Sequence, residues 1–251
     1  MKIKVILSCF MLMATVGLQA QTQVIAHRGY WKTDGSAQNS LRAIVKADSI
    51  GCYGSEFDVW LTVDGVLVVN HDARVEGLIV EKSQSADVLA LRLPNGEALP
   101  TLEQYLEEAK KLNTRLVFEL KPHANRLHEV KAVIDGILMV ERMGLSDRVE
   151  YITFSADALE EFIKYAPKGT PIYYLNGEKT PSELYRMGAA GMDYHLSILK
   201  KHPEWIKECH DLGLKVNVWT VNKEEDMKWC IGHGIDFITT NEPELLQKLL
   251  K

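Results

Sequence analysis

Two carboxylates separated by a single residue are the first feature of this sequence that could do chemistry. Glu56 and Asp58 belong to the run EFDVWL, which reads as a strand, so both side chains point to the same side. Two adjacent unpaired carboxylates inside a fold repel each other and lose hydration, so something positive must compensate. Glu119, in the later run LVFEL, supplies a third carboxylate. Three carboxylate oxygens completed by water suit a hard divalent cation, Mg²⁺ or Ca²⁺.

A purely structural role for these acids remains open from the residues alone. Arg28 follows the first strand-like run and Lys121 follows Glu119, so either cation could pair with the carboxylates as an ion-pair network. No cysteine or histidine spacing in the chain indicates zinc.

Two histidines stand at the ends of apolar strands. His27 ends the first strand-like run, and His71 follows the run VLVVN. Imidazoles exchange protons near neutral pH with an attacking oxygen and a leaving alkoxide. Acids for a metal, cations for an anion and imidazoles for protons together indicate phosphoryl chemistry.

The elements that must position these groups alternate between strand and helix. The predicted strands are Val24–His27, Ser55–Trp60, Val66–Asn70, Arg115–Leu120, Val149–Phe154, Pro171–Leu175, Gly191–Tyr194, Lys215–Thr220 and Asp236–Thr239. The predicted helices are Ser40–Ser49, Thr101–Lys111, Leu127–Met143, Ala156–Tyr165, Pro181–Met187, Leu199–Asp211, Glu224–Ile231 and Pro243–Leu250. The predicted N-caps are Thr101, Ser155, Thr180 and Asn222, and the predicted left-handed C-terminal glycines are Gly144, Gly188 and Gly213.

About eight strand–helix units predict an α/β fold, a TIM-type (β/α)8 barrel. A doubly wound sheet has the same local pattern, but it would gather its polar residues around one switch point. Here they follow many different strands. The segment 73–99 is short, so we expect a modest loop rather than a large lid.

The first twenty residues differ from the rest. Lys2 and Lys4 precede an apolar run that is too short to span a bilayer, and Ala20 offers a cleavage point. We therefore expect a cleaved signal peptide at 1–20, one barrel domain at 21–251, and export across the inner membrane to the periplasm. Removing both lysines takes the net charge from −5 to −7, which argues against binding to nucleic acid or to an anionic membrane. The oligomeric state is left open.

The motifs taken together resemble the glycerophosphodiester phosphodiesterase family, from Val24 to the C-terminus. They are HRG (27–29), EFDV (56–59), TVDG (62–65), VVNHD (68–72), PTLEQYL (100–106), FELK (118–121), VNVWTVN (216–222) and GIDFITTNEP (234–243).

The resemblance implies a role for each candidate residue. Glu56, Asp58 and Glu119 correspond to the metal ligands, and His27 and His71 to the general acid and base. Arg28 and Lys121 would hold the phosphate. Trp219 would pack against the glycerol or its substituent, although it could equally be a core aromatic. The implied reaction is metal-dependent hydrolysis of a small glycerophosphodiester to glycerol 3-phosphate and an alcohol.

Two departures from the family pattern each remove a carboxylate at the rim of the site. Gln38-Asn39-Ser40 stands where the family usually has Glu-Asn-Thr, and Thr240-Asn241-Glu242-Pro243 stands where it has Thr-Asp-x-Pro. Two alternatives therefore remain beside the main expectation. One is a lipid phosphodiesterase of the phospholipase C or sphingomyelinase D type, and the other is a relative that binds glycerophosphate without hydrolysing it.

Overall fold

Eight parallel strands close into a barrel in the computed structural model, which describes residues 21–251; the predicted signal peptide lies outside the described residues. Each strand pairs with the next along the chain, and β1 closes the ring by pairing with both β2 and β11. The predicted barrel is therefore confirmed. The barrel strands are β1 (Gln23–Ala26), β2 (Gly54–Leu61), β6 (Arg115–Leu120), β7 (Val149–Thr153), β8 (Ile172–Tyr174), β9 (Gly191–His195), β10 (Lys215–Trp219) and β11 (Phe237–Thr240).

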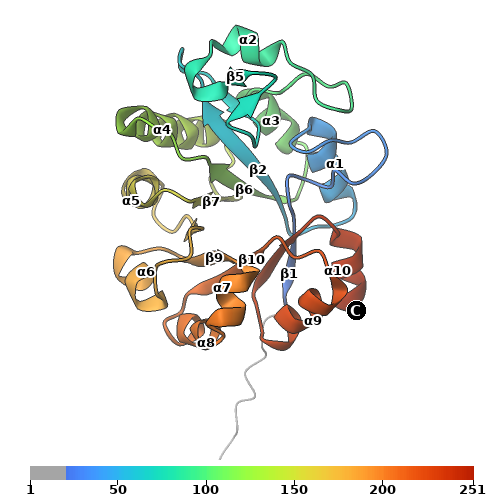
Figure 1. The fold of residues 1–251 in the computed structure, drawn as a ribbon, viewed down its shortest axis with the longest axis vertical. Helices are drawn as coiled ribbons and strands as arrows, with labels where there is room; N and C mark the ends of the chain where they lie inside the picture. Colours follow the sequence, from blue (N-terminus) through green and yellow to red (C-terminus); the bar gives the residue numbers. More distant parts are fainter. Residues whose placement is uncertain (1–20) are drawn as a thin grey trace, which may run out of the picture.

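Helices surround the strands on the outside of the barrel (Figure 1). They are α1 (Leu41–Ser49), α3 (Leu102–Ala109), α4 (Arg126–Arg142), α5 (Ala156–Tyr165), α6 (Pro181–Met187), α7 (Leu196–Lys201), α8 (Glu204–Asp211), α9 (Glu224–Gly232) and α10 (Pro243–Leu249). Between residues 21 and 251, no helix has both the length and the apolar character needed to cross a bilayer.

Strand β2 shows how the alternation of side chains divides the core from the site. All eight of its residues are buried. Phe57 points outward and packs against Tyr105 of α3, with ring centroids 4.4 Å apart. Glu56 and Asp58 take the opposite, inner face, above an apolar cluster that includes Ile25 and Val117. The helix layer therefore holds the apolar face of β2, and the barrel interior receives its acids.

Two predictions about elements are wrong. The expected helix Leu199–Asp211 is two helices, α7 and α8, because Pro203 cannot donate the backbone hydrogen bond that a continuous helix needs there. Asn222 does not cap α9, which begins after Lys223 without a side-chain cap. The side-chain oxygen of Asn222 instead accepts the Asn241 N–H at 2.8 Å, so Asn222 fixes the turn after β11.

The other predicted caps are confirmed. Thr101, Ser155 and Thr180 each accept a backbone N–H of the helix that follows. Thr101 and Thr180 also take part in capping boxes with Gln104 and Glu183. Gly144, Gly188 and Gly213 all have φ between 70° and 89°.

The strand predicted at Val66–Asn70 is β3 (Leu67–Val69), which lies outside the ring of parallel strands and pairs antiparallel with β2. The segment that follows it folds into short elements of its own, namely β4 (Arg74–Val75), β5 (Leu78–Ile79), the 3₁₀ helix η1 (Val80–Lys82) and α2 (Ser85–Leu89). Figure 1 shows this segment as a small excursion at one end of the molecule.

Candidate active site

A strained turn after β1 prepares the first part of the site. Arg28 and Gly29 both have left-handed backbone conformations, with φ of 56° and 75°. A side chain at Gly29 would come within 2.6 Å of the Ala43 Cβ, so only glycine fits there. The turn directs the Arg28 backbone N–H to Glu56 Oε2, 2.7 Å away. A non-glycine residue in this conformation costs about 1–3 kcal/mol, which is typical of backbone held for function.

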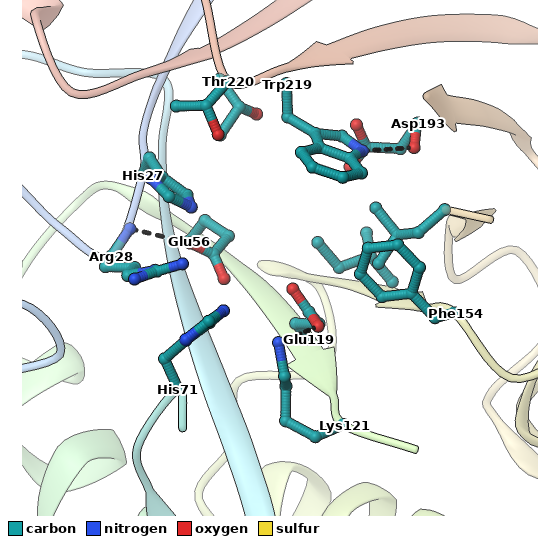
Figure 2. A pocket seen from close by; sticks show the side chains of 13 residues that line it. His27, Arg28, Glu56, His71, Glu119, Lys121, Phe154, Asp193, Trp219 and Thr220 are labelled. Atoms are coloured by element: carbon teal, nitrogen blue, oxygen red, sulfur yellow. Dashed lines mark hydrogen bonds and ion pairs between the residues drawn. The ribbon is translucent and has the colours of Figure 1, made fainter. Parts of the chain in front are cut away.

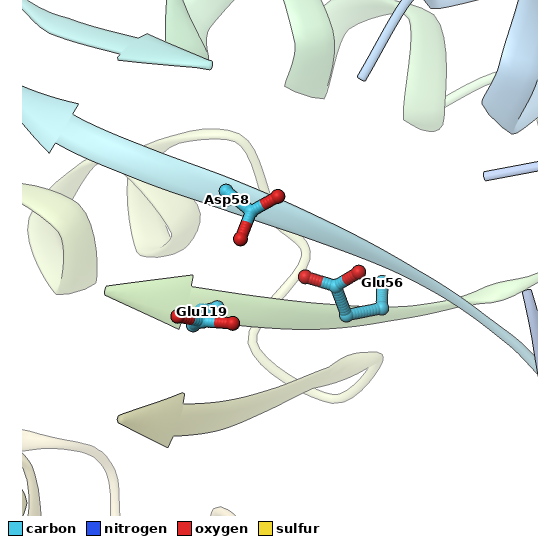
Figure 3. Close-up of side chains that lie close together, drawn as sticks. All are labelled: Glu56, Asp58 and Glu119. Atoms are coloured by element: carbon cyan, nitrogen blue, oxygen red, sulfur yellow. The ribbon is translucent and has the colours of Figure 1, made fainter. Parts of the chain in front are cut away.

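The register of two neighbouring strands brings the three predicted carboxylates together. Asp58 of β2 lies beside Glu119 of β6, and Glu56 precedes Asp58 by two residues on the same face. One oxygen from each of the three carboxylates lies within 4.8 Å of the other two, and all three side chains are buried. Figure 3 shows the three carboxylates converging from these two strands.

Two cations meet part of this acidic group. The Lys121 ammonium lies 2.6 Å from Glu119 Oε1 and 3.2 Å from Asp58 Oδ1. The Arg28 Nε atom lies 3.6 Å from Asp58 Oδ2. The ion pairs that the sequence left open as an alternative therefore exist, but they centre on Asp58 and Glu119. Glu56 Oε1 is buried and has no hydrogen-bond partner within residues 21–251.

The carboxylates fit a divalent cation. Oxygens that share a Ca²⁺ ion at 2.3–2.6 Å are at most about 5 Å apart, which matches the spacing of the three acids. All three donors are hard carboxylate oxygens, and the orphaned Glu56 oxygen still needs a positive partner. Glu56, Asp58 and Glu119 would hold the ion, with water completing its shell.

The pKa values of the three carboxyl groups are shifted in different directions. Burial, reinforced by Asp58 and Glu119, raises the pKa of Glu56 well above its usual value. Burial and the neighbouring Asp58 raise the pKa of Glu119 to about 8, against the opposing effect of Lys121. Burial also acts to raise the pKa of Asp58, but Lys121, His71 and Arg28 outweigh it and the net pKa is lowered. Ionising all three acids at neutral pH therefore requires more positive charge than the two side chains provide.

Both predicted histidines line the same pocket as the acids. His27 Nδ1 lies 2.8 Å from Asn241 Oδ1. The Trp31 indole N–H, which can only donate, reaches the same atom at 3.0 Å, so that atom must be the amide oxygen. His27 therefore carries its proton on Nδ1 and presents the lone pair of Nε2 away from Asn241.

The two imidazoles have different partners. Burial and the neighbouring Arg28 lower the pKa of His27 to about 4, against the opposing effects of the Asn241 hydrogen bond and of Asp58. His71 Nδ1 contacts the Asp72 carboxylate at 2.7 Å. Burial lowers the pKa of His71 as well, while Asp58 and Asp72 act to raise it. The pKa values of both imidazoles are therefore lowered, and His71 differs from His27 in contacting a carboxylate, Asp72, rather than a neutral amide.

The pocket has a polar side and an aromatic side. Figure 2 shows His27, Arg28 and His71 on one side and Phe154 and Trp219 on the other, with Glu56 and Glu119 between them. The Trp219 and Phe154 rings meet edge to face, with centroids 5.4 Å apart. The Trp219 N–H donates to the Asp193 carbonyl at 2.9 Å, which fixes the indole at the pocket wall.

Comparison with known proteins agrees with this geometry. The model of the glycerophosphoryl diester phosphodiesterase family matches residues 27–245. The chain belongs to this family. A curated glycerophosphodiester phosphodiesterase from Caldanaerobacter subterraneus is 30% identical over 92% of this chain and 98% of its own length. The family is one of enzymes, phosphoric diester hydrolases, so the chain is an enzyme of this class.

Solved structures of phosphodiesterases share the barrel. A glycerophosphodiester phosphodiesterase from Parabacteroides distasonis is 51% identical, covers 92% of this chain and 97% of its own, and has a TM-score of 0.90. A phosphodiesterase from Oleispira antarctica, solved with the product sn-glycerol-3-phosphate, is 23% identical with a TM-score of 0.77 over 91% of this chain and 96% of its own. At this identity, the likeness to the Oleispira antarctica protein shows a shared fold.

The structure brings all eight predicted site residues of this glycerophosphodiester phosphodiesterase family member together. Seven line one pocket, and Asp58 lies at its edge through Lys121 and Arg28. Their roles remain predictions. Trp219 lines the pocket and is half-buried, so it is accessible to a ligand as well as packed on Phe154.

The sequence reasoning missed two residues of the site. Asn39 donates to Asp58 Oδ2 at 2.9 Å and accepts the Asp58 N–H at 3.2 Å. Its left-handed φ of 61° suits asparagine. The signal was present, since Asn39 lies in the family motif between Gln38, which accepts from Arg28 at 2.5 Å, and Ser40, which caps α1. The second is Asp193, which lines the pocket and carried no motif.

Proposed function

We propose that this protein hydrolyses glycerophosphodiesters to glycerol 3-phosphate and an alcohol with the help of a divalent cation. The observation that carries the proposal is the convergence of the carboxylate triad, two cationic side chains and two histidines on one pocket. The product seen in the Oleispira antarctica phosphodiesterase supports the same outcome for this related fold. A divalent cation held by the triad would polarise a phosphate oxygen and offset the negative charge that develops during cleavage.

Arg28 and Lys121 bind and orient the phosphate in this proposal. Both side chains contact the acidic group. The Arg28 guanidinium lies beside Asp58, and the Lys121 ammonium lies between Asp58 and Glu119. Guanidinium and ammonium groups donate to phosphate oxygens and lower the cost of added negative charge. Gln38 accepts from the Arg28 guanidinium and holds its orientation.

The two histidines divide the proton transfers. His27 Nε2 takes the proton of the attacking water, because its tautomer is fixed by Asn241 and its neutral form is favoured. His71 gives a proton to the oxygen of the leaving alcohol. Burial lowers its pKa overall, but the Asp72 carboxylate at Nδ1 acts to raise it and orients the ring. The water oxygen forms the new bond to phosphorus as the bond to the alcohol oxygen breaks.

Product analysis tests the proposal. Purified protein with glycerophosphocholine and Mg²⁺ or Ca²⁺ should yield glycerol 3-phosphate and choline, detected as one new phosphomonoester by ³¹P NMR. Phosphocholine, or activity confined to intact lipids in vesicles, would place the protein with the lipid phosphodiesterases instead. Binding of glycerol 3-phosphate without turnover in excess cation would indicate a relative that has lost catalysis. A cyclic glycerophosphate that accumulates early would show attack by a glycerol hydroxyl rather than by water.

We also propose that the protein is exported and acts in the periplasm. The support is the N-terminal pattern of two lysines, an apolar run and Ala20. Mass spectrometry of the protein released by osmotic shock should give a chain that begins at Gln21. A full-length chain retained in the spheroplast fraction would contradict export.

A further inference from the structure

Asp193 is a buried acid in the pocket that the proposed mechanism does not use. It lies in the middle of β9, beside Asn217 of β10, and is 1% exposed. It lines the same pocket as His27 and Lys121. Its Oδ1 atom has no hydrogen-bond partner in the part of the chain that the structure describes.

The neighbours of Asp193 do not satisfy this oxygen. The Asn217 side chain lies close enough to oppose the rise in the pKa of Asp193, but no hydrogen bond joins it to Oδ1. Its own oxygen accepts the Val218 N–H at 2.8 Å and the Thr239 hydroxyl at 3.2 Å. The Trp219 N–H reaches the Asp193 carbonyl rather than the carboxyl group. A buried polar atom without a partner is costly, so a group that enters the pocket and pairs with it gains that free energy on binding.

The two sides of the pocket fix which end of a phosphodiester could reach this acid. The phosphate belongs on the side of Arg28 and Lys121, where the positive charges lie. Asp193 lies away from both cations, next to Trp219 (Figure 2). A short carbon chain that extends from the phosphate along this aromatic wall would bring its polar end toward Asp193.

The character of Asp193 favours a hydroxyl group over a cation. Burial, reinforced by Glu119, raises the pKa of Asp193 well above its usual value, so its neutral form is favoured. A neutral carboxyl group has one donor and acceptor capacity, and a hydroxyl can match both. An ammonium group would require the ionised acid.

We propose that Asp193 binds a hydroxyl of the glycerol moiety and thereby selects glycerol over other alcohols on this side of the phosphate. The proposal deepens the function proposed above and rests on it. Asp193 is a specificity residue in this role, and the proton transfers stay with His27 and His71.

Ligand binding tests the proposal without turnover. Calorimetric titration would compare glycerol 3-phosphate with propyl phosphate, which has the same phosphate and carbon chain but no hydroxyls, and with phosphoethanolamine. We expect the wild-type protein to bind glycerol 3-phosphate about three- to tenfold more tightly than propyl phosphate, the size of one buried hydrogen bond. Equal affinity for the two would overturn the proposal.

Two variants of similar size sharpen this test. Asp193→Asn keeps a donor and an acceptor and should retain the preference for glycerol 3-phosphate, whereas Asp193→Leu should abolish it. Propyl phosphate should bind both variants as it binds the wild type, and thermal unfolding checks that both are folded. A preference retained in Asp193→Leu, or a phosphoethanolamine affinity above that of glycerol 3-phosphate that both variants lose, would contradict the proposal.

This result is separate from the proposed activity. If the wild-type protein discriminates between the two ligands through Asp193 but hydrolyses no glycerophosphodiester, the activity fails and the hydroxyl site stands. If it hydrolyses glycerophosphocholine and Asp193→Leu keeps the preference for glycerol 3-phosphate, the hydroxyl site fails and the activity stands.

Discussion

Buried carboxylates occur at both ends of the barrel interior, but the two ends differ in whether every carboxylate oxygen has a partner. At the N-terminal end of the strands, Glu150 of β7 accepts the Tyr53 hydroxyl at 2.6 Å and the Arg115 Nε–H at 2.9 Å. At the C-terminal mouth, Glu56 Oε1 and Asp193 Oδ1 have no partner among the described residues. Glu150, at the N-terminal or closed end, finds its hydrogen-bond donors within the protein. Glu56 and Asp193, at the C-terminal mouth, each have an oxygen left for a ligand.

The difference teaches that burial of charge alone does not mark a functional site. Glu150 is 3% exposed and Glu56 is 2% exposed, so the two are equally removed from solvent. What separates them is the set of donors around each carboxylate. The comparison predicts that changes at the mouth reduce activity while the fold persists, and that changes at the closed end do the reverse.

The largest expected effect is at the mouth. His27→Ala and His71→Ala should each lower kcat by about two to four orders of magnitude, because each loses one proton transfer. Thermal unfolding should show both variants folded, and steady-state kinetics with glycerophosphocholine gives the rate. Wild-type turnover in either variant would remove that histidine from the mechanism.

A smaller effect is expected at the closed end. Glu150→Ala leaves the Tyr53 hydroxyl and the partly exposed Arg115 without their acceptor, and should lower the free energy of unfolding by about 1–3 kcal/mol. Urea unfolding gives this value, and kcat at 25 °C should remain that of the wild type. Lost activity in a variant of unchanged stability would show that the two ends are not distinct in the way described.

The smallest effect is a shift in pH dependence. The pKa of His27 is lowered to about 4, so the base stays unprotonated and activity should persist well below pH 6.5 on the acid side. Asn241→Asp places a carboxylate on Nδ1, favours the imidazolium and should move the acid limb of the kcat/KM profile upward by about one to three pH units.

The matched control for this shift is Asp72→Asn, which leaves the Asn241 contact to His27 intact. Its acid limb should stay at the wild-type position. An acid limb that does not move in Asn241→Asp would show that Asn241 does not set the state of His27.

Much of the barrel was predictable because its elements carry local signals. The strand Arg115–Leu120 and the helices Ala156–Tyr165 and Pro181–Met187 were predicted at their observed bounds, since apolar periodicity and caps define them. The division of Leu199–Asp211 was missed, although Pro203 was visible, because the apolar pattern continues across the break. Asn222 was misread as a cap because its real partner, Asn241, lies 19 residues away.

The site was predictable where two residues share a strand or a motif. The spacing of Glu56 and Asp58 predicts that the two side chains share a face of one strand. The position of Glu119 beside them depends on the register of β2 and β6. Asp193 could not be found from the sequence, since a single acid in GMDYH gives no sign of which barrel face it occupies or of its lack of donors. The sequence also could not show whether Arg28 and Lys121 pair with all three carboxylates. In the structure they pair with Asp58 and Glu119 and leave Glu56 Oε1 unpaired.

The most direct test of the central claim is a calorimetric titration of cation-free protein with Mg²⁺ and with Ca²⁺ in two buffers of different ionisation enthalpy. The raised pKa values of Glu56 and Glu119 mean that these acids favour their protonated forms without a cation, so binding should release protons and should strengthen as the pH rises. Glu56→Gln should abolish binding or weaken it greatly, while Glu150→Gln at the closed end should bind as the wild type does. No binding of either cation by the wild type, or equal binding by Glu56→Gln, would contradict the account.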